Sequence, residues 1–149
     1  MGEIVVGVDG SAGGNAALAW AATEATLRGV TLRAVCVLKS PASWMGMGEA
    51  LGSGVAVNVS DEDLEQVALD TIADAIASVG IGDELTIVRD GRVGRAATVL
   101  VALSAEADLV VVGACGHGDV GSVLLGSVAM HCTHHARCPV TVVPSALAT

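Results

Sequence analysis

The stretch from Leu109 to Ser127 reads LVVVGACGHGDVGSVLLGS, an unbroken apolar run followed directly by a glycine-rich segment. The run Leu109–Val112 contains no polar residue, which is typical of a strand buried on both faces of a sheet. Glycines at 113, 116, 118, 121 and 126 are more than one tight turn requires. The pattern predicts a buried strand that ends in a glycine loop and leads into a helix over 127–136.

The same alternation of apolar runs and helical stretches extends outward along the whole chain. Four further strands are predicted at 4–8, 31–38, 84–89 and 140–143, and three further helices at 12–28, 60–80 and 96–106. Five strands alternating with four helices favour an α/β fold, with one doubly wound parallel sheet covered by helices on both faces. A length of 149 residues corresponds to a single domain over 1–149.

Two of the predicted helices carry end signals in the sequence. Ser11 and Ser60 stand at the N-cap positions, and Gly29 and Gly80 close the same helices. The second of them has apolar residues at helical spacing and six acids on its remaining surface, which we interpret as a solvated face. Its expected apolar residues are Leu64, Val67, Ala68, Ile72, Ile76 and Val79.

Composition excludes several classes of protein. Hydrophobic residues make up 52% of the chain and charged residues 15%, unlike a disordered protein. Seven basic against 16 acidic residues give a net charge of −9, which repels nucleic acids and anionic membrane surfaces. No apolar run approaches the roughly 18 residues of a membrane span. We therefore expect neither nucleic acid nor a membrane as a partner.

Cysteine usage indicates the compartment. The four cysteines, Cys36, Cys115, Cys132 and Cys138, form no CxxC pair, and the first residues show no basic region of a secretory signal. Reduced thiols in the cytoplasm are the expected state. Cys115 lies inside the glycine loop, so it is the thiol placed for redox sensing, as a minor hypothesis.

Ligands of open α/β sheets bind at the carboxyl ends of strands where the winding direction reverses, and two segments of this chain suit that place. They are Asp9-Gly10-Ser11 and Gly113–Ser127. Glycines let backbone N–H groups approach phosphate oxygens, and the N-terminus of the next helix favours negative charge. Glycines that only form turns, and Asp9 as a turn or cap residue, are the structural alternatives.

Known phosphate-binding motifs fail in this loop. Gly116–Gly121 satisfies GxGxxG, but no acid follows Asp119 to bind a dinucleotide ribose. Gly121–Ser127 has P-loop spacing but lacks its lysine, since the chain's single lysine is Lys39. Ser127 lacks the GxSxG context of a hydrolase nucleophile. A dinucleotide enzyme, a Walker-type NTPase and a serine hydrolase are therefore not expected.

The glycine loop instead resembles the signature G-x2-G-x9-G-[S/T] of the universal stress proteins. Gly113, Gly116 and Gly126-Ser127 fit it without a gap, and the segments 6–11 and 134–143 resemble the start and end of that family. The resemblance implies strand order 3-2-1-4-5, a homodimer, and a cytoplasmic stress-response protein that binds ATP. We interpret the chain as a regulatory module. Any ATP hydrolysis is expected to be slow, because the loop has no lysine and no general base or metal triad is visible in the sequence.

The resemblance also implies roles for single residues. Asp9 would contact the ribose or adenine, and Val37 would offer backbone groups to adenine. The residues around the ribose and phosphates would be Gly113, Gly116, Gly126, Ser127 and Val128.

One departure bears on the phosphates. Many relatives carry Arg or Lys where this chain has Ala114, Cys115 and His117, and Asp119 stands nearby. His117 offsets the missing charge only in part, because an imidazole is mostly neutral at pH 7. A carboxylate near a triphosphate lowers affinity unless a metal lies between them. ATP binding that is weak, dependent on Mg²⁺, or lost all remain open, and the alternative function is a nucleotide-free dimeric adaptor.

Two further features carry weaker hypotheses. His131, His134, His135 and Cys138 suggest zinc, but HExxH fails at Cys132 and no CxxC completes a site, so no metal site is predicted. The segment 40–59, with Trp44, Met45 and Met47, has no period. A nucleotide lid, a partner surface or a disordered stretch would each fit it.

Overall fold

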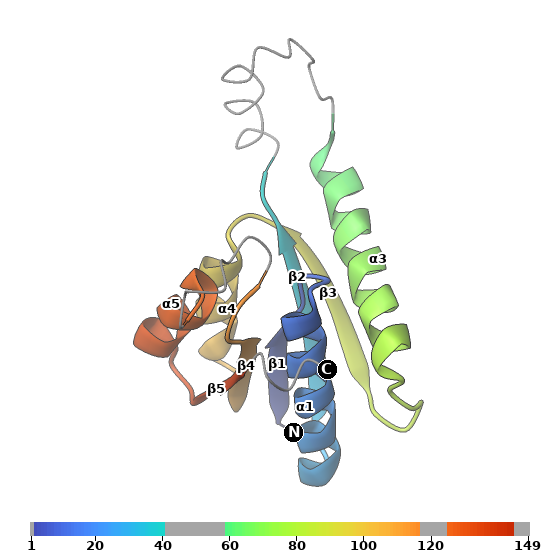
Figure 1. Ribbon diagram of the computed structural model, residues 1–149, viewed down its shortest axis with the longest axis vertical. Helices are drawn as coiled ribbons and strands as arrows, with labels where there is room; N and C mark the ends of the chain where they lie inside the picture. The colour runs from blue at the N-terminus through green and yellow to red at the C-terminus, as the bar shows by residue number, and fades with distance from the viewer. Residues whose placement is uncertain (1, 41–58, 117–124, 145–149) are drawn as a thin grey trace.

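The computed structural model describes residues 2–40, 59–116 and 125–144. The segment 41–58, including Trp44, and the loop residues 117–124, including His117 and Asp119, lie outside the described residues. The described residues form one sheet of five parallel strands in the order β3-β2-β1-β4-β5 (Figure 1). The strands are β1 (Glu3–Gly7), β2 (Thr31–Leu38), β3 (Ile87–Val93), β4 (Leu109–Gly113) and β5 (Val140–Val143). The predicted order is confirmed.

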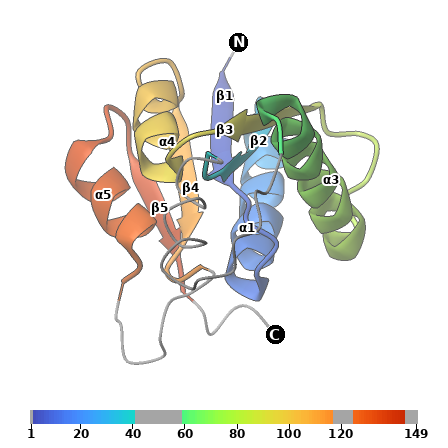
Figure 2. The same cartoon turned by 90° about the horizontal axis from the view of Figure 1, so that it is seen from above.

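Helices cover both faces of this sheet, as predicted. They are α1 (Ala12–Arg28), α3 (Asp61–Val79), α4 (Ala96–Ser104) and α5 (Ser127–His135). Helices α1 and α3 lie on one side and α4 and α5 on the other (Figure 2). The packing of strand β4 on both faces of the sheet explains why its sequence is apolar throughout. Leu109 and Val111 pack into the core under α1, and Val110 and Val112 into the core under α4 and α5.

The end signals of α1 and α3 act as the sequence indicates. The Ser11 hydroxyl accepts a hydrogen bond from the Gly14 N–H at 3.0 Å, and the Ser60 hydroxyl accepts one from the Asp63 N–H at 3.2 Å. Gly29 and Gly80 end the two helices with φ angles of 65° and 76°, a left-handed conformation that favours glycine. These local signals therefore fix where both helices begin and end.

The strand expected at 84–89 lies instead at Ile87–Val93, so that prediction is wrong at both ends. The polar residues Asp90 and Arg92 are part of the strand because each has a partner. Asp90 accepts hydrogen bonds from Arg33 at 3.0 Å and from Arg92 at 2.8 Å. Gly91 lies against α3, and a Cβ there would come within 2.8 Å of a backbone oxygen of that helix. Periodicity cannot anticipate such long-range pairing.

Two smaller expectations about helices also change. Val67 is 50% exposed, so it does not belong to the buried face of α3, which consists of Ala68, Ile72 and Ala75. Helix α4 ends at Ser104, two residues earlier than expected. There the buried Ser104 hydroxyl accepts a hydrogen bond from the Arg137 N–H at 2.8 Å, which ties the end of α4 to the segment after α5.

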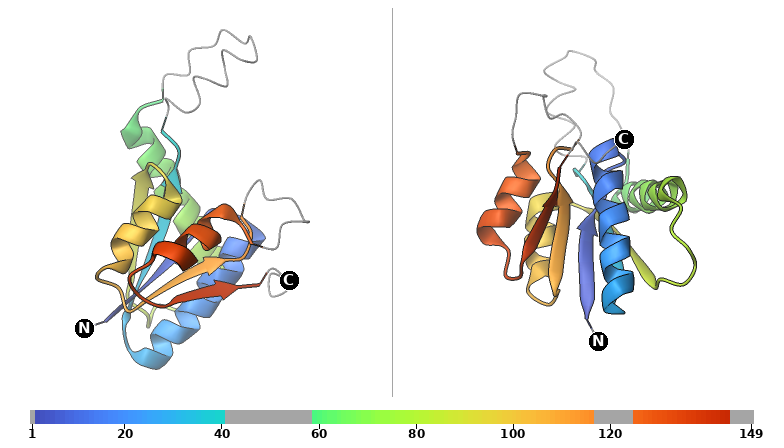
Figure 3. Two further views of the ribbon diagram at one scale, coloured as in Figure 1. Left: turned by 90° about the vertical axis from the view of Figure 1, so that its left-hand side faces the viewer. Right: turned by 60° about the horizontal axis from the view of Figure 1, so that its bottom comes forward.

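The central strand β1 marks the point where the winding of the sheet reverses. It pairs with β2 on one side and with β4 on the other. The chain leaves β1 through α1 toward β2 and β3, and later returns through α4 on the opposite face to β4. The carboxyl ends of β1, β4 and β5 therefore lie at one edge of the sheet (Figure 3). This is the position where open α/β sheets bind their ligands.

Candidate functional site

A cavity of about 140 Å³ opens at this edge of the sheet. Its walls come from the carboxyl ends of β1, β2 and β4 and from the first turns of α1, α4 and α5. The lining residues are Gly7, Val8, Asp9, Gly14, Val35, Val37, Ala96, Leu100, Val112, Gly113, Ala114, Cys115, Gly116, Gly126, Ser127, Val128 and Ala129.

The structure brings seven of the eight residues expected to bind nucleotide to this one cavity, although they are spread over 120 positions of the chain. They are Asp9, Val37, Gly113, Gly116, Gly126, Ser127 and Val128. The eighth, His117, lies outside the described residues. Sequence reasoning missed the remaining lining residues, because apolar residues of β2 and α4 belong to no motif. The sequence did contain a signal for Gly14. Two adjacent glycines in the first turn of a helix destabilise it, so their presence indicates a close contact that excludes side chains.

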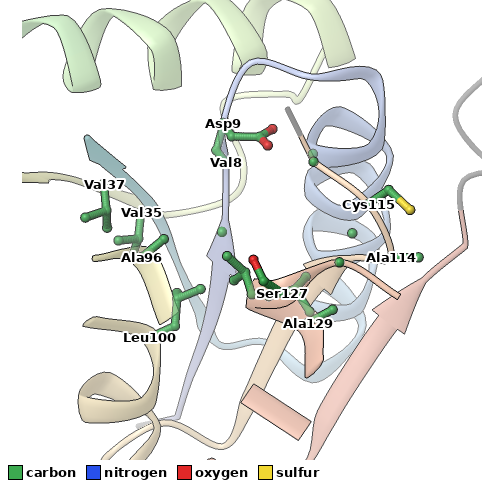
Figure 4. A pocket seen from close by; sticks show the side chains of 17 residues that line it. Val8, Asp9, Val35, Val37, Ala96, Leu100, Ala114, Cys115, Ser127 and Ala129 are labelled. Atoms are coloured by element: carbon green, nitrogen blue, oxygen red, sulfur yellow. The ribbon is translucent and has the colours of Figure 1, made fainter. Parts of the chain in front are cut away.

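One end of the cavity is apolar. Val35 and Val37 project from β2, and Ala96 and Leu100 face them from the first turns of α4 (Figure 4). Leu100 is 2% exposed and Val35 is 1% exposed, so both side chains are anchored in the core beneath the cavity. This end can hold a flat apolar group such as an aromatic base.

The opposite end is built from backbone. A Cβ on Gly113 would come within 2.9 Å of the Gly13 carbonyl oxygen, and a Cβ on Gly13 within 2.6 Å of the Cys115 carbonyl oxygen. The start of α1 therefore packs directly on the loop after β4, with no side chain between them. A side chain on Gly13 or Gly113 would separate the two segments, which explains why these two positions are glycine.

Asp9 lies between the two ends. Its Oδ1 accepts hydrogen bonds from the Ser11 N–H at 3.0 Å and from the Ser11 hydroxyl, which in turn caps α1. A Cβ on Gly14 would lie 2.6 Å from Oδ1, and one on Gly116 would lie 2.5 Å from Oδ2. The role of Asp9 in a turn is thus present in the structure, and the same carboxylate also lines the cavity.

The first turn of α5 faces the glycine end. Residues 126–129 all line the cavity, and the Ser127 hydroxyl is directed into it (Figure 4). The Gly126 N–H donates to the Ala114 carbonyl at 2.6 Å, which joins the helix start to the loop after β4. The N-cap is Gly126, which has no side chain to cap the helix. Backbone N–H groups at such a helix start attract anions.

Among the described residues that line the cavity, a single group carries charge. Asp9 is the one charged residue among the 17 that line it. Mg²⁺ is held in many sites by one or two carboxylates together with substrate phosphates, so Asp9 is a candidate ligand only when phosphates are present. Among the described residues, no group of three or more His, Cys, Asp or Glu side chains could hold a metal ion. The zinc hypothesis included His131 and His135, whose ring centres lie 4.5 Å apart.

The thiols differ in their surroundings. Burial raises the pKa of Cys36 and of Cys132 to about 11, and burial also raises the pKa of Cys138. These three thiols stay protonated at neutral pH and are poor nucleophiles. Cys115 lines the cavity, with its sulfur directed away from Asp9 (Figure 4).

Comparison with known proteins gives consistent matches along the chain. The sequence profile of the universal stress protein family matches residues 1–144. Universal stress protein Rv2005c from Mycobacterium tuberculosis is 33% identical over 143 residues, which cover 95% of this chain and 48% of the relative. The chain thus spans about half the length of the curated relatives it matches.

Solved structures with the same fold include two from this family. Universal stress protein UspA from Lactobacillus plantarum superposes with a TM-score of 0.70 at 24% identity, covering 95% of this chain and 97% of the other. The universal stress protein from Archaeoglobus fulgidus in complex with dAMP superposes with a TM-score of 0.60 at 25% identity, covering 96% and 98% of the two chains.

Proposed function

The chain belongs to the universal stress protein family, and from that premise we propose that it is a regulatory protein of the stress response that binds an adenine nucleotide. The observation that carries the proposal is the division of the cavity into an apolar end and a backbone end, with a carboxylate between them. A nucleotide has the same three parts in the same order: an apolar base, a hydroxylated sugar and an anionic phosphate.

In the proposed complex the adenine lies against Val35, Val37 and Leu100. Asp9 accepts hydrogen bonds from the ribose, and the phosphates lie over Gly113, Gly116 and the first turn of α5 formed by Gly126, Ser127 and Val128. His117 completes the expected set. The dAMP bound to the related Archaeoglobus fulgidus protein supports an adenine nucleotide as the ligand class.

ATP, with or without Mg²⁺, is the ligand that the glycine signature suggests for this chain. We expect any hydrolysis of it to be far slower than the median enzyme rate of about 10 per second. Asp9 is the one residue of the lining able to act as a base, and its Oδ1 is already engaged by Ser11. The nucleotide is therefore proposed as a regulatory ligand and not as a substrate.

We further propose a cytoplasmic homodimer. Cys36, Cys132 and Cys138 are free thiols, which suits a reducing compartment. No helix in the described segments has the length and apolarity to cross a membrane. Strand β5 lies at an edge of the sheet and pairs with β4 alone among the described strands, and apolar edges of this kind are commonly paired or covered.

Light scattering tests this assembly. A dimer at micromolar concentration that becomes monomeric in Val142→Lys supports an interface at β5. Val142 packs partly against the α5 side of the core, so circular dichroism first has to show that the variant is folded. A wild-type monomer at these concentrations rejects the dimer.

Calorimetry tests the nucleotide proposal. We expect wild-type protein to bind at least one of AMP and ATP, and Asp9→Ala to weaken binding of AMP by about two- to tenfold, because hydrogen bonds contribute about 0.5–1.5 kcal/mol each. The matched control is Asp83→Ala. Asp83 is exposed and precedes β3, so it lies at the amino ends of the strands, away from the cavity. No binding of either nucleotide at millimolar concentration rejects the proposal in favour of the nucleotide-free adaptor.

A further inference from the structure

The basic residues of the chain avoid the backbone end of the cavity. No Lys or Arg occurs between Arg95 and Arg137, a stretch that contains α4, β4, the whole glycine loop and α5. All seven basic residues are therefore elsewhere in the chain, and none of them is among the residues that line the cavity.

Several of these cations are engaged far from the phosphate end. Arg28 pairs with Glu24 at 2.7 Å, and Arg33 and Arg92 both pair with Asp90. Two others lie beside the apolar end. Arg95 directly precedes Ala96, and Lys39 follows Leu38, whose carbonyl oxygen accepts a hydrogen bond from the Gly94 N–H at 2.8 Å. Among the described residues, no Lys or Arg lines the end of the cavity where the phosphates are expected.

Among the described residues, two charges of opposite sign act at the phosphate end, and the negative one is larger. The start of α5 supplies the equivalent of about +0.5 charge. The Asp9 carboxylate opposes it, close enough to the loop that a Cβ on Gly116 would lie 2.5 Å from its Oδ2. Each further negative charge placed about 8 Å from such a carboxylate weakens binding by a factor of about 2 to 30, depending on the local dielectric.

We propose that this cavity selects an adenine nucleotide with a single phosphate over a triphosphate when no divalent metal is present. The inference rests on the proposed function and adds the ligand class. One phosphate fits between the glycine backbone and the start of α5, where N–H groups and the helix dipole stabilise it. Two further phosphates add negative charge that no lysine or arginine of the lining neutralises.

Calorimetry with AMP and ATP in a chelating buffer tests this selection, at about 0.05 M and 0.5 M salt. We expect AMP to bind at least tenfold more tightly than ATP at low salt. The preference for AMP should fall at high salt, because screening weakens the repulsion of the triphosphate more than that of the monophosphate. Added Mg²⁺ also narrows the gap, because it neutralises part of the charge of ATP and leaves AMP binding nearly unchanged.

Two charge-removing variants show whether Asp9 is responsible. Asp9→Asn keeps an acceptor oxygen and removes the charge, so we expect the ratio of AMP to ATP affinity to fall at least threefold. Asp83→Asn makes the same change at the opposite edge of the sheet and leaves the ratio unchanged.

The outcomes separate this inference from the proposed function. Binding of ATP as tight as that of AMP without metal overturns the inference and leaves the proposed function standing. A preference for AMP that responds neither to salt nor to Asp9→Asn also overturns it, since the selection is then steric. If neither nucleotide binds, both proposals are rejected.

Discussion

The two ends of the cavity are built from different parts of the residues. At the apolar end, side chains from β2 and α4 form the wall, and Val35 and Leu100 reach into the core. At the opposite end, the wall is the backbone of Gly113, Gly116 and Gly126, and the Gly13 backbone packs against Gly113. Side chains can be exchanged with graded effects, whereas a backbone contact allows no added atom. The two ends should therefore respond very differently to a change of one carbon.

The largest effect is expected at Gly113. In Gly113→Ala the new Cβ meets the Gly13 carbonyl oxygen at 2.9 Å, and backbone on both sides cannot move aside cheaply. We expect the free energy of unfolding to fall by about 1–3 kcal/mol. Nucleotide affinity should fall more than tenfold. Urea unfolding and calorimetry measure the two effects.

The control for this change is Gly82→Ala, where a Cβ meets nothing within 4 Å. It should leave both stability and binding close to wild type. If Gly113→Ala behaves like this control, the backbone contact between α1 and the loop after β4 does not limit the site, and the contrast between the two ends fails.

A smaller effect is expected at Ser11, which links Asp9 to α1. Ser11→Ala removes the hydrogen bond to the Gly14 N–H and one partner of Asp9, so unfolding free energy should fall by about 1 kcal/mol and nucleotide affinity several-fold. Ser60→Ala removes the equivalent cap of α3 and should cost the same stability with no loss of affinity. Equal binding by the two variants would show that Ser11 acts on the helix alone.

The apolar end should show a graded response. Val37→Ala removes two methyl groups from the wall, and at about 0.8 kcal/mol per buried carbon we expect affinity to fall by up to about fifteenfold. Val99→Ala removes the same atoms from the same core cluster outside the cavity and should leave affinity unchanged. Unchanged affinity in Val37→Ala, measured by calorimetry, would show that only the backbone of this residue meets the base.

The smallest effect is expected at Asp90, which belongs to neither end. Hydrogen bonds from Arg92 and then from Arg33 hold the pKa of its carboxyl below the usual value. The stabilisation is therefore present above the ordinary aspartate pKa, near 4, and is lost as pH falls through the lower value in the folded state. Asp90→Asn should lower the free energy of unfolding by about 1 kcal/mol at pH 7, since its partners are partly exposed.

Acid unfolding provides the readout for Asp90. The difference between wild type and Asp90→Asn should shrink below about pH 4, because protonation removes the same charge from the wild-type protein. Nucleotide affinity at pH 7 should not change. A loss of affinity in this variant would show that the cavity depends on the general stability of the sheet, and not on its two ends.

Much of the architecture was predictable because its signals are local. Runs of β-branched residues, capping serines and glycines after helices predicted nine elements, and the glycine signature predicted residues that the fold brings to one cavity. Strand β3 is the exception. Its Asp90-Gly91-Arg92 segment has no strand pattern, yet it pairs with Val35–Val37 of β2, and Asp90 accepts a hydrogen bond from Arg33, 57 positions earlier in the chain.

The sequence by itself determined the order of the elements, the ends of α1 and α3, the family and the glycine signature. Tertiary structure alone decided which surfaces complete the cavity. The backbones of Gly13 and Gly113 are in contact although they are 100 positions apart in the sequence. Leu100 of helix α4 faces Val37 of strand β2. Spacing along a chain encodes contacts only within a turn or a strand. Close approach between distant segments depends on how the whole sheet and its helices pack.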